Sequence, residues 1–434
     1  MERKKWTLVL LVTIAAGLLL TCELEPRYPE EPGGEESPKS ATTFESALPD
    51  GFLWGVATSG FQVEGGDTSS QWAKWVADGR TREKIYKATD FIHRYPEDVG
   101  NAAALGVKAF RISIEWARLE PQPGIIDRGI VAYYDRLIET IYSHGMEPVV
   151  TLLHFSYPQW LEAAGGWESP LAVARYLKHV ARVVTRYKDK VRYWITFNEP
   201  NLWVPAGWLF GIEPPGKQSL EATIKVAGNV IAAHRGAYDL IHRLDSDAEV
   251  SATVFCLEFA DLPPLLQRSS FDADWFCPAI SDTVDFVSLD YYYRFHSLRE
   301  IITSIGRPWL YPIDPEGLYD VIVEYDLRYG LPILITENGM ATYNTFPRRD
   351  GWTRPEHLRA HVKALQQASE EGANVIGYLY WSITDNYEWG EYDSRFGLYS
   401  VNCRPYFPFY LRRRPADGVE VYRQIIINNG VAME

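Results

Sequence analysis

Thr196-Phe197-Asn198-Glu199-Pro200 directly follows the apolar run Tyr193-Trp194-Ile195 in this 434-residue chain. In the same way, Thr336-Glu337-Asn338-Gly339 follows Pro332-Ile333-Leu334-Ile335. Short runs of apolar, β-branched and aromatic residues are typical of buried parallel strands, and α/β sheets place their active sites at the carboxyl ends of such strands. Both glutamates are therefore predicted to lie at one edge of a parallel sheet. Either glutamate taken alone is equally well explained as a cap of the following helix.

Strand-like and helix-like segments alternate from Phe52 to the end of the chain. The helix-like segments carry start signals, such as Pro170 in the segment 169–187 and Pro355 after Arg354. This alternation predicts repeated βα units around a parallel sheet. The predicted strands are Leu53–Ala57, Ala109–Ile114, Pro148–Leu153, Tyr193–Phe197, Val250–Phe255, Phe286–Leu289, Ile333–Thr336 and Val375–Tyr380.

The segments around both glutamates resemble family 1 of the glycoside hydrolases, the β-glucosidase family. Its acid/base motif T-F-N-E-P and its nucleophile motif T-E-N-G are both present without substitution, at 196–200 and 336–339. The resemblance covers nearly all of the chain from about Phe52 onward. It implies an α/β fold, a (β/α)8 TIM barrel in a single catalytic domain. It also implies a retaining exo-acting β-glycosidase, most simply a β-glucosidase, with Glu199 as acid/base and Glu337 as nucleophile.

The resemblance also assigns residues that support this pair. Arg111 matches the family arginine next to the nucleophile, although a salt bridge on the floor of the barrel would place it similarly. Tyr292 matches the tyrosine that hydrogen-bonds the nucleophile. Asp290 stands where the family has asparagine. This third carboxyl either raises the pKa of a catalytic carboxyl or hydrogen-bonds a neighbour, and the sequence leaves both alternatives open.

Further matches imply how the substrate is bound. The side chains expected to bind the cleaved sugar are Gln62, His154, Asn198, Trp381, Glu388 and Trp389. Family members that act on 6-phosphorylated sugars carry a serine and a lysine after the last of these tryptophans. Here Ser394 is present but a lysine is missing, so we expect unphosphorylated substrates, either β-linked oligosaccharides or aryl and alkyl β-glycosides. Trp309 and Tyr311 are alternatives for the aromatic residue that stacks on the leaving group.

The charge and cysteine content indicate which other classes of partner are not expected. The formal net charge is -14, and Arg412-Arg413-Arg414 is the one basic cluster, so nucleic acid is not expected as a partner. Three cysteines follow the N-terminal segment, Cys256, Cys277 and Cys403, and their spacing is not that of a metal site. No metal and no cofactor are predicted.

The first residues are predicted to direct export rather than to fold. Residues 1–22 combine a basic start with a short apolar run that ends at Cys22, which resembles a lipoprotein-type signal segment with a lipidated cysteine. An ordinary secretory signal and an uncleaved anchor are the alternatives. Residues 23–46 form an acidic, proline-rich tether predicted to be disordered, and 47–434 the glycosidase domain. The expected location is the cell envelope, with the protein attached to a bacterial membrane through the lipid anchor only.

Two other functions fit the same resemblance. One is a catalytically inactive surface lipoprotein that binds saccharides, although the presence of both glutamates disfavours it. The other is a transglycosidase of the same fold, which passes the sugar to an acceptor other than water through the same covalent intermediate. The sequence does not separate transfer from hydrolysis.

Overall fold

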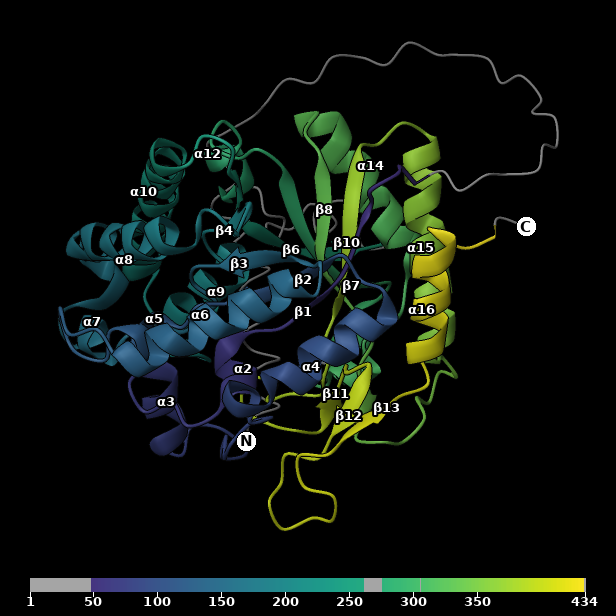
Figure 1. Ribbon diagram of the computed structural model, residues 1–434, viewed down its shortest axis with the longest axis horizontal. Helices are drawn as coiled ribbons and strands as arrows, with labels where there is room; N and C mark the ends of the chain where they lie inside the picture. Colours follow the sequence, from purple (N-terminus) through teal and green to yellow (C-terminus); the bar gives the residue numbers. More distant parts are fainter. Residues whose placement is uncertain (1–47, 261–274, 305, 433–434) are drawn as a thin grey trace.

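The central element of the structure is a nearly closed parallel barrel (Figure 1). The computed structural model describes residues 48–260, 275–304 and 306–432, so the predicted signal segment with Cys22 and the tether lie outside the described residues. The barrel strands are ordered β5-β4-β3-β2-β1-β10-β8-β7-β6. Their bounds are β1 Leu53–Ala57, β2 Ala109–Ser113, β3 Glu147–Thr151, β4 Tyr193–Ile195, β5 Glu249–Ser251, β6 Thr253–Phe259, β7 Val287–Phe295, β8 Ile333–Asn338 and β10 Val375–Trp381.

The nine segments form eight barrel positions. β5 pairs with β4 and β6 pairs with β7, and the two are separated in the chain only by Ala252. The predicted strand Val250–Phe255 is thus interrupted, and its two halves join the ends of the sheet. The remaining strands lie at the predicted places. The predicted (β/α)8 barrel is therefore confirmed.

Helices surround the barrel on its outside (Figure 1). The long helices are α4 Phe91–Leu105, α6 Arg128–Ser143, α8 Leu171–Tyr187, α10 Leu220–Leu244, α14 Pro315–Tyr329, α15 Arg354–Glu370 and α16 Val419–Asn428. The start of α15 is fixed by a capping box, in which Thr353 and Glu356 each bond the other's backbone. The strands are buried on both faces because helices cover one side and barrel side chains fill the other. One apolar cluster takes single residues from successive strands, as expected for the barrel interior.

The last helix closes the structure on the first strand. Tyr422 of α16 donates a hydrogen bond to the Gly55 carbonyl oxygen of β1 at 2.5 Å. Asn429, just beyond α16, accepts a bond from the Trp54 indole at 2.9 Å and donates one to the Leu48 carbonyl at 3.1 Å. Residues separated by 375 positions are therefore joined at the amino end of the barrel.

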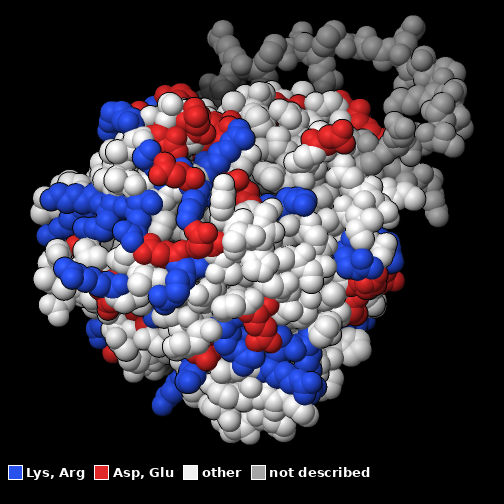
Figure 2. Space-filling view, viewed as in Figure 1, with Lys and Arg blue, Asp and Glu red and all other residues white. Residues whose placement is uncertain are grey.

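Both signs of charge occur on the face shown in Figure 2, with basic side chains gathered over α8. In the part of the chain that the structure describes, no helix has the length and apolarity needed to cross a membrane.

Candidate active site

A cleft of about 1110 Å³ opens at the carboxyl ends of the barrel strands. Nine of the ten side chains that the sequence assigned to catalysis or sugar binding line it, and the tenth, Arg111, lies buried beneath it against Glu337. Residues that are far apart in the chain meet here because parallel strands end at the same rim. The nine lining residues are Gln62, His154, Asn198, Glu199, Tyr292, Glu337, Trp381, Glu388 and Trp389.

Glu199 stands between β4 and the short helix α9, Pro200–Val204. Its backbone has a φ of 38°, in the left-handed region, and its N–H donates to Thr253 Oγ1 at 2.8 Å. Its carboxyl forms no capping bond with α9. The helix-cap explanation of this glutamate is therefore wrong, and the side chain is left to face the cleft.

Glu337 lies inside β8, buried, and both of its carboxylate oxygens are bonded. Arg111 Nη1 donates to Oε1 at 2.6 Å, and the Tyr292 hydroxyl donates to Oε2 at 2.7 Å. Burial raises the pKa of Glu337, whereas Arg111 and Tyr292 act in the opposite direction because they favour the carboxylate. The turn that follows packs directly on β10, since a Cβ at Gly339 would lie 2.0 Å from a carbonyl oxygen of that strand.

The pKa of Glu199 is shifted in the same direction as that of Glu337, but more strongly. Burial, followed by the charges of Asp290 and Glu337, raises the pKa of Glu199 well above its ordinary value, and Arg111 opposes this only in part. Carboxylate oxygens of Glu199, Asp290 and Glu337 lie within 4.8 Å of one another. The two carboxyls thus differ in degree: Glu337, bonded by Arg111 and Tyr292, ionises more readily than Glu199, which is the better acid of the pair.

Asp290 fulfils both alternatives that the sequence left open. Its Oδ1 accepts a bond from the Thr336 hydroxyl at 2.6 Å and lies 4.0 Å from Arg111 Nη1. It also raises the pKa of Glu199, and its own pKa is raised well above the ordinary value by burial and by Glu337. The third carboxyl is therefore part of the electrostatic environment of the catalytic pair.

Replacing Asp290 by asparagine is expected to lower the pKa of Glu199, because the ionised form of Asp290 is one of the causes that raise it. Glu199 would then lose its proton at lower pH, so the basic limb of the kcat/KM profile should move to lower pH. The measurement is a pH profile on an aryl β-glycoside, with Asp320→Asn as a control that removes the same charge at the surface. An unchanged basic limb, or one at higher pH, would contradict this role for Asp290.

The polar end of the cleft is built around Glu388. Its carboxylate accepts bonds from Gln62 Nε2 at 3.1 Å and from the Trp381 indole at 3.2 Å. Gln62 also donates to Asn386 Oδ1 at 3.0 Å, which fixes its amide. Burial, the largest cause of the shift, raises the pKa of Glu388 to about 8. These fixed polar groups can accept and donate hydrogen bonds to sugar hydroxyls.

His154 lies between aromatic rings of the cleft. Its ring is nearly parallel to those of Trp381 and Trp389, with centroids 6.1 and 5.9 Å away. Burial and the charge of Arg111 lower the pKa of His154 well below its ordinary value, so it is neutral at pH 7. Its Nδ1 has no hydrogen-bond partner among the described residues. A neutral imidazole with a free nitrogen is suited to a sugar hydroxyl.

Tyr311, not Trp309, lines the cleft among the described residues. The ring of Tyr311 packs 4.2 Å from that of Tyr293, which also lines the cleft. Trp309 packs instead on Tyr343, with ring centroids 4.8 Å apart. Of the two alternatives from the sequence, the geometry therefore favours Tyr311 for contact with a leaving group.

Two threonines of the site were not predicted. Thr253 Oγ1 donates to Asn198 Oδ1 at 3.2 Å, besides accepting from Glu199. Thr151 Oγ1 accepts from Arg111 Nε at 3.1 Å, while Arg111 Nη2 donates to Asn198 Oδ1 at 2.5 Å. Because its oxygen is occupied, the Asn198 amide presents its NH2 group to ligands. Isolated strand threonines carry no local sequence signal that would identify them.

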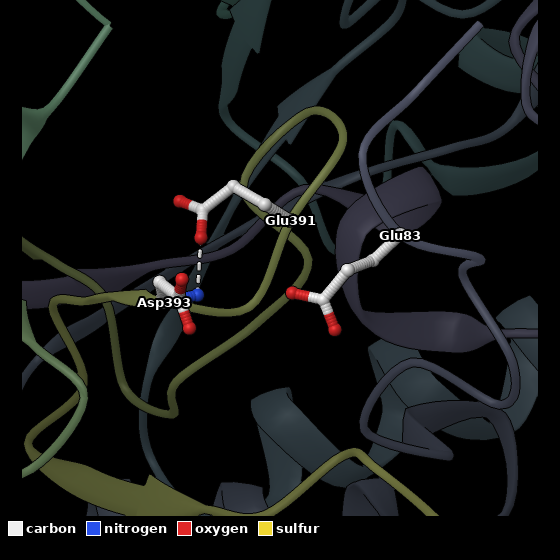
Figure 3. A group of neighbouring side chains, drawn as sticks. All are labelled: Glu83, Glu391 and Asp393. Carbon is white, nitrogen blue, oxygen red and sulfur yellow. Dashed lines mark hydrogen bonds between the residues drawn. The ribbon is translucent and has the colours of Figure 1, made fainter.

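A second group of carboxylates, Glu83, Glu391 and Asp393, lies at the edge of the cleft, where their side chains converge (Figure 3). The Asp393 backbone N–H donates to the Glu391 carboxylate. Arg404 donates to Glu83 at 2.6 and 2.7 Å and to Asp393 at 2.7 Å, and Arg82 also pairs with Asp393. Because two arginines compensate these charges, the ion pairs of this group connect neighbouring loops.

Comparisons with known proteins agree with this geometry. A family model described as glycosyl hydrolase family 1 matches residues 44–264 and 277–431. A β-galactosidase of Pyrococcus woesei is 29% identical, covering 88% of this chain and 98% of its own. β-Glucosidase A of Thermotoga maritima is also 29% identical, with the same two coverages. The solved β-glycosidase from Pyrococcus horikoshii superimposes with a TM-score of 0.79 at 27% identity, covering 90% of this chain and 97% of its own. The relatives' names differ in the sugar, so similarity alone does not select one.

Proposed function

Because the chain belongs to glycosyl hydrolase family 1 and is therefore a glycoside hydrolase, we propose that it is a retaining exo-acting β-glycosidase. The proposed substrates are β-linked oligosaccharides and aryl or alkyl β-glycosides. Terminal non-reducing β-D-glucosyl residues, and related sugars, would be released from them through a covalent glycosyl-enzyme intermediate. Transfer to an acceptor other than water uses the same intermediate and differs only in the last step.

One observation carries this proposal: two buried carboxyls lie close together, and only one is bonded by a cation. Arg111 and Tyr292 bond Glu337 and favour its carboxylate against the effect of burial, whereas the pKa of Glu199 is raised well above its ordinary value without such bonds. Their oxygens lie within 4.8 Å of each other. Retaining enzymes have carboxyl groups about 5 to 5.5 Å apart, and inverting enzymes need a wider separation for a water molecule.

In the first step, Glu337 attacks the anomeric carbon and forms the glycosyl ester. Glu199 gives its proton to the glycosidic oxygen as that bond breaks, so the leaving group departs as a neutral alcohol. In the second step, the Glu199 carboxylate takes a proton from water, whose oxygen attacks the same carbon and releases Glu337. The Asn198 amide supplies a hydrogen bond to the sugar in both steps. Two displacements restore the original β configuration.

The anomer formed first tests this mechanism. A panel of nitrophenyl β-glycosides identifies the sugar that is cleaved fastest, and proton NMR of the early product then reports its configuration. We expect the β anomer before mutarotation. First appearance of the α anomer would exclude retention, and absence of cleavage across the panel would exclude the proposed activity. Adding an alcohol acceptor and quantifying the glycoside formed separates transfer from hydrolysis.

Glu388 is proposed to select unphosphorylated sugars. Its carboxyl accepts bonds from Gln62 and Trp381 and would contact two sugar hydroxyls, so Glu388→Ala should lower kcat/KM by roughly two orders of magnitude. Its pKa is about 8. Above this pH the ionised group repels a phosphate, so the preference for β-glucoside over 6-phospho-β-glucoside should grow as pH rises through 8.

The experiment measures both glucosides on wild type and Glu388→Ala between pH 6 and 9. The ratio of their kcat/KM values cancels the titration of the catalytic pair. Glu370→Ala, at an exposed position on α15, is the matched control. A wild type that prefers the phosphosugar would refute this assignment.

We also propose that the protein is exported and attached to a membrane at Cys22. The support is the sequence of residues 1–22. Expression of the full chain in a bacterium should give membrane-bound protein that incorporates labelled fatty acid, and Cys22→Ser should abolish the labelling and release the protein. Soluble wild-type protein that begins at another residue would refute the anchor.

A further inference from the structure

Glu213 belongs to the part of the cleft wall that follows Glu199 in the chain. It follows the helical turn η3, Pro205–Leu209, which continues directly from α9 and hence from the acid/base Glu199. Glu213 lines the cleft, and its charge contributes to the raised pKa of Glu199. Because Glu199 protonates the leaving oxygen in the proposed function, a group on its side of the cleft faces the leaving group. This inference therefore rests on that function.

One oxygen of the Glu213 carboxyl lacks a hydrogen-bond partner among the described residues. Its Oε2 is buried and forms no hydrogen bond with any described residue. Burial raises the pKa of Glu213 to about 8, and no arginine or lysine among the described residues compensates it. The cleft-lining residues of the segment that leads to Glu213 are largely apolar: Leu202, Pro205, Phe210 and Ile212. An unpaired carboxyl in such a wall destabilises the protein unless a ligand satisfies it.

The backbone around Glu213 is held in place. The N–H of Ile212 donates to Ala206 at 3.0 Å and that of Lys217 donates to Gly207 at 2.9 Å, so the segment folds back on η3. Trp208 anchors this turn in the core with 1% of its surface exposed. The carboxyl therefore has a fixed position rather than one that a mobile loop provides by chance.

The charge of the cleft indicates what would bind. Five glutamates line it, and the lining arginines are Arg80 and Arg82. Arg82 is already paired with Asp393, and the guanidinium carbon of Arg80 lies 3.9 Å from the ring centroid of Trp75. Among the described residues, neither of these arginines pairs with Glu213. A cation bound beside Glu213 would favour its ionised form, whereas an anion would disfavour it.

We propose that Glu213 makes the leaving-group side of the cleft selective for glycosides whose leaving group carries a positively charged nitrogen, such as an amino sugar or an alkylammonium-bearing alcohol. The ammonium would form a charge-assisted hydrogen bond with the carboxylate and occupy the buried oxygen that now has no partner. A neutral leaving group of the same shape lacks this charge, and an acidic one is repelled.

The test compares two substrates with the sugar that the nitrophenyl panel selects. One has a para-(aminomethyl)phenyl leaving group and the other para-(hydroxymethyl)phenyl, which differ in charge but little in size. For the wild type at pH 7, we expect kcat/KM to favour the amine by about tenfold to a hundredfold. Glu213→Gln should bring the ratio close to one. Glu221→Gln, which removes an exposed carboxylate paired with Lys225, should keep the wild-type ratio.

Binding of the two S-linked analogues to wild-type protein, measured by calorimetry, gives a second readout that needs neither turnover nor a variant. Tighter binding of the amine, by a similar factor, supports the proposal. Equal affinities in wild type, or an unchanged kcat/KM ratio in folded Glu213→Gln, would overturn it. Hydrolysis with a ratio of one rejects this inference but leaves the proposed function. Selective binding of the amine without any hydrolysis supports this inference but rejects the proposed function.

Discussion

Replacing Glu337 by alanine is expected to lower kcat by roughly four to six orders of magnitude, as removal of a catalytic nucleophile does in other enzymes. In the wild type, Arg111 and Tyr292 hold its two oxygens at 2.6 and 2.7 Å, so the carboxylate is fixed beside the sugar. Without it, no covalent intermediate forms. The variant leaves space for a small anion on the same face of the sugar.

Azide should occupy that space and attack the anomeric carbon in place of Glu337. A single displacement inverts the configuration, so a β-glycoside with a good leaving group should give an α-glycosyl azide, identified by NMR. Glu337→Ala also leaves Arg111 buried without its partner, which can destabilise the fold by about 3 to 5 kcal/mol. Glu337→Gln, which keeps the side-chain volume, and thermal unfolding of both variants separate this effect from lost chemistry.

Two outcomes would refute Glu337 as nucleophile. One is a folded Glu337→Gln variant with near wild-type kcat. The other is azide rescue that yields the β-glycosyl azide.

Replacing Glu199 by alanine should have the second largest effect, and the effect should depend on the leaving group. The first step needs its proton only when the leaving group is a poor one, so alkyl β-glycosides should lose roughly two to four orders of magnitude in kcat/KM. A dinitrophenolate leaving group departs without being protonated, so a dinitrophenyl β-glycoside should lose far less kcat/KM. Its turnover should become limited by the second step, for which Glu199 activates water.

Azide gives a result opposite to that expected for Glu337→Ala. It needs no general base, so it should accelerate the second step of Glu199→Ala and give the β-glycosyl azide. The basic limb of the kcat/KM profile should also disappear, because the group whose raised pKa causes it is absent. Glu221→Ala serves as the control for both catalytic variants. Equal losses for alkyl and dinitrophenyl substrates would show that Glu199 is not the acid.

The sequence predicts the barrel because the strands are apolar runs separated by helices with clear start signals. The break at Ala252 is not predictable in this way, since it arises where β5 and β6 pair with different neighbours to close the sheet. That closure is a property of the whole barrel. No pattern within Val250–Phe255 reports it.

The site is predictable to a different degree for each residue. Glu199 and Glu337 follow from strand ends and motifs, whereas Thr253 and Thr151 act through single hydroxyls on neighbouring strands and carry no motif. The raised pKa of Glu388 depends on burial by residues from elsewhere in the chain. Glu213 was not predicted because its significance comes from its surroundings, in which Oε2 finds no hydrogen-bond partner among the described residues.

The bonds between α16 and β1 can form only when the chain has been made almost to its end. Trp54 is bonded to Asn429, and Gly55 to Tyr422, so these two hydrogen bonds of the first strand form only after the last helix has been made. A ribosome adding about 5 to 20 residues per second needs on the order of 20 to 80 seconds to make the intervening chain. Until then, β1 can pair with β2 and β10 but lacks its bonds to the last helix. Chains truncated before Tyr422 would lack these bonds permanently, and we expect them to unfold more readily than the full chain.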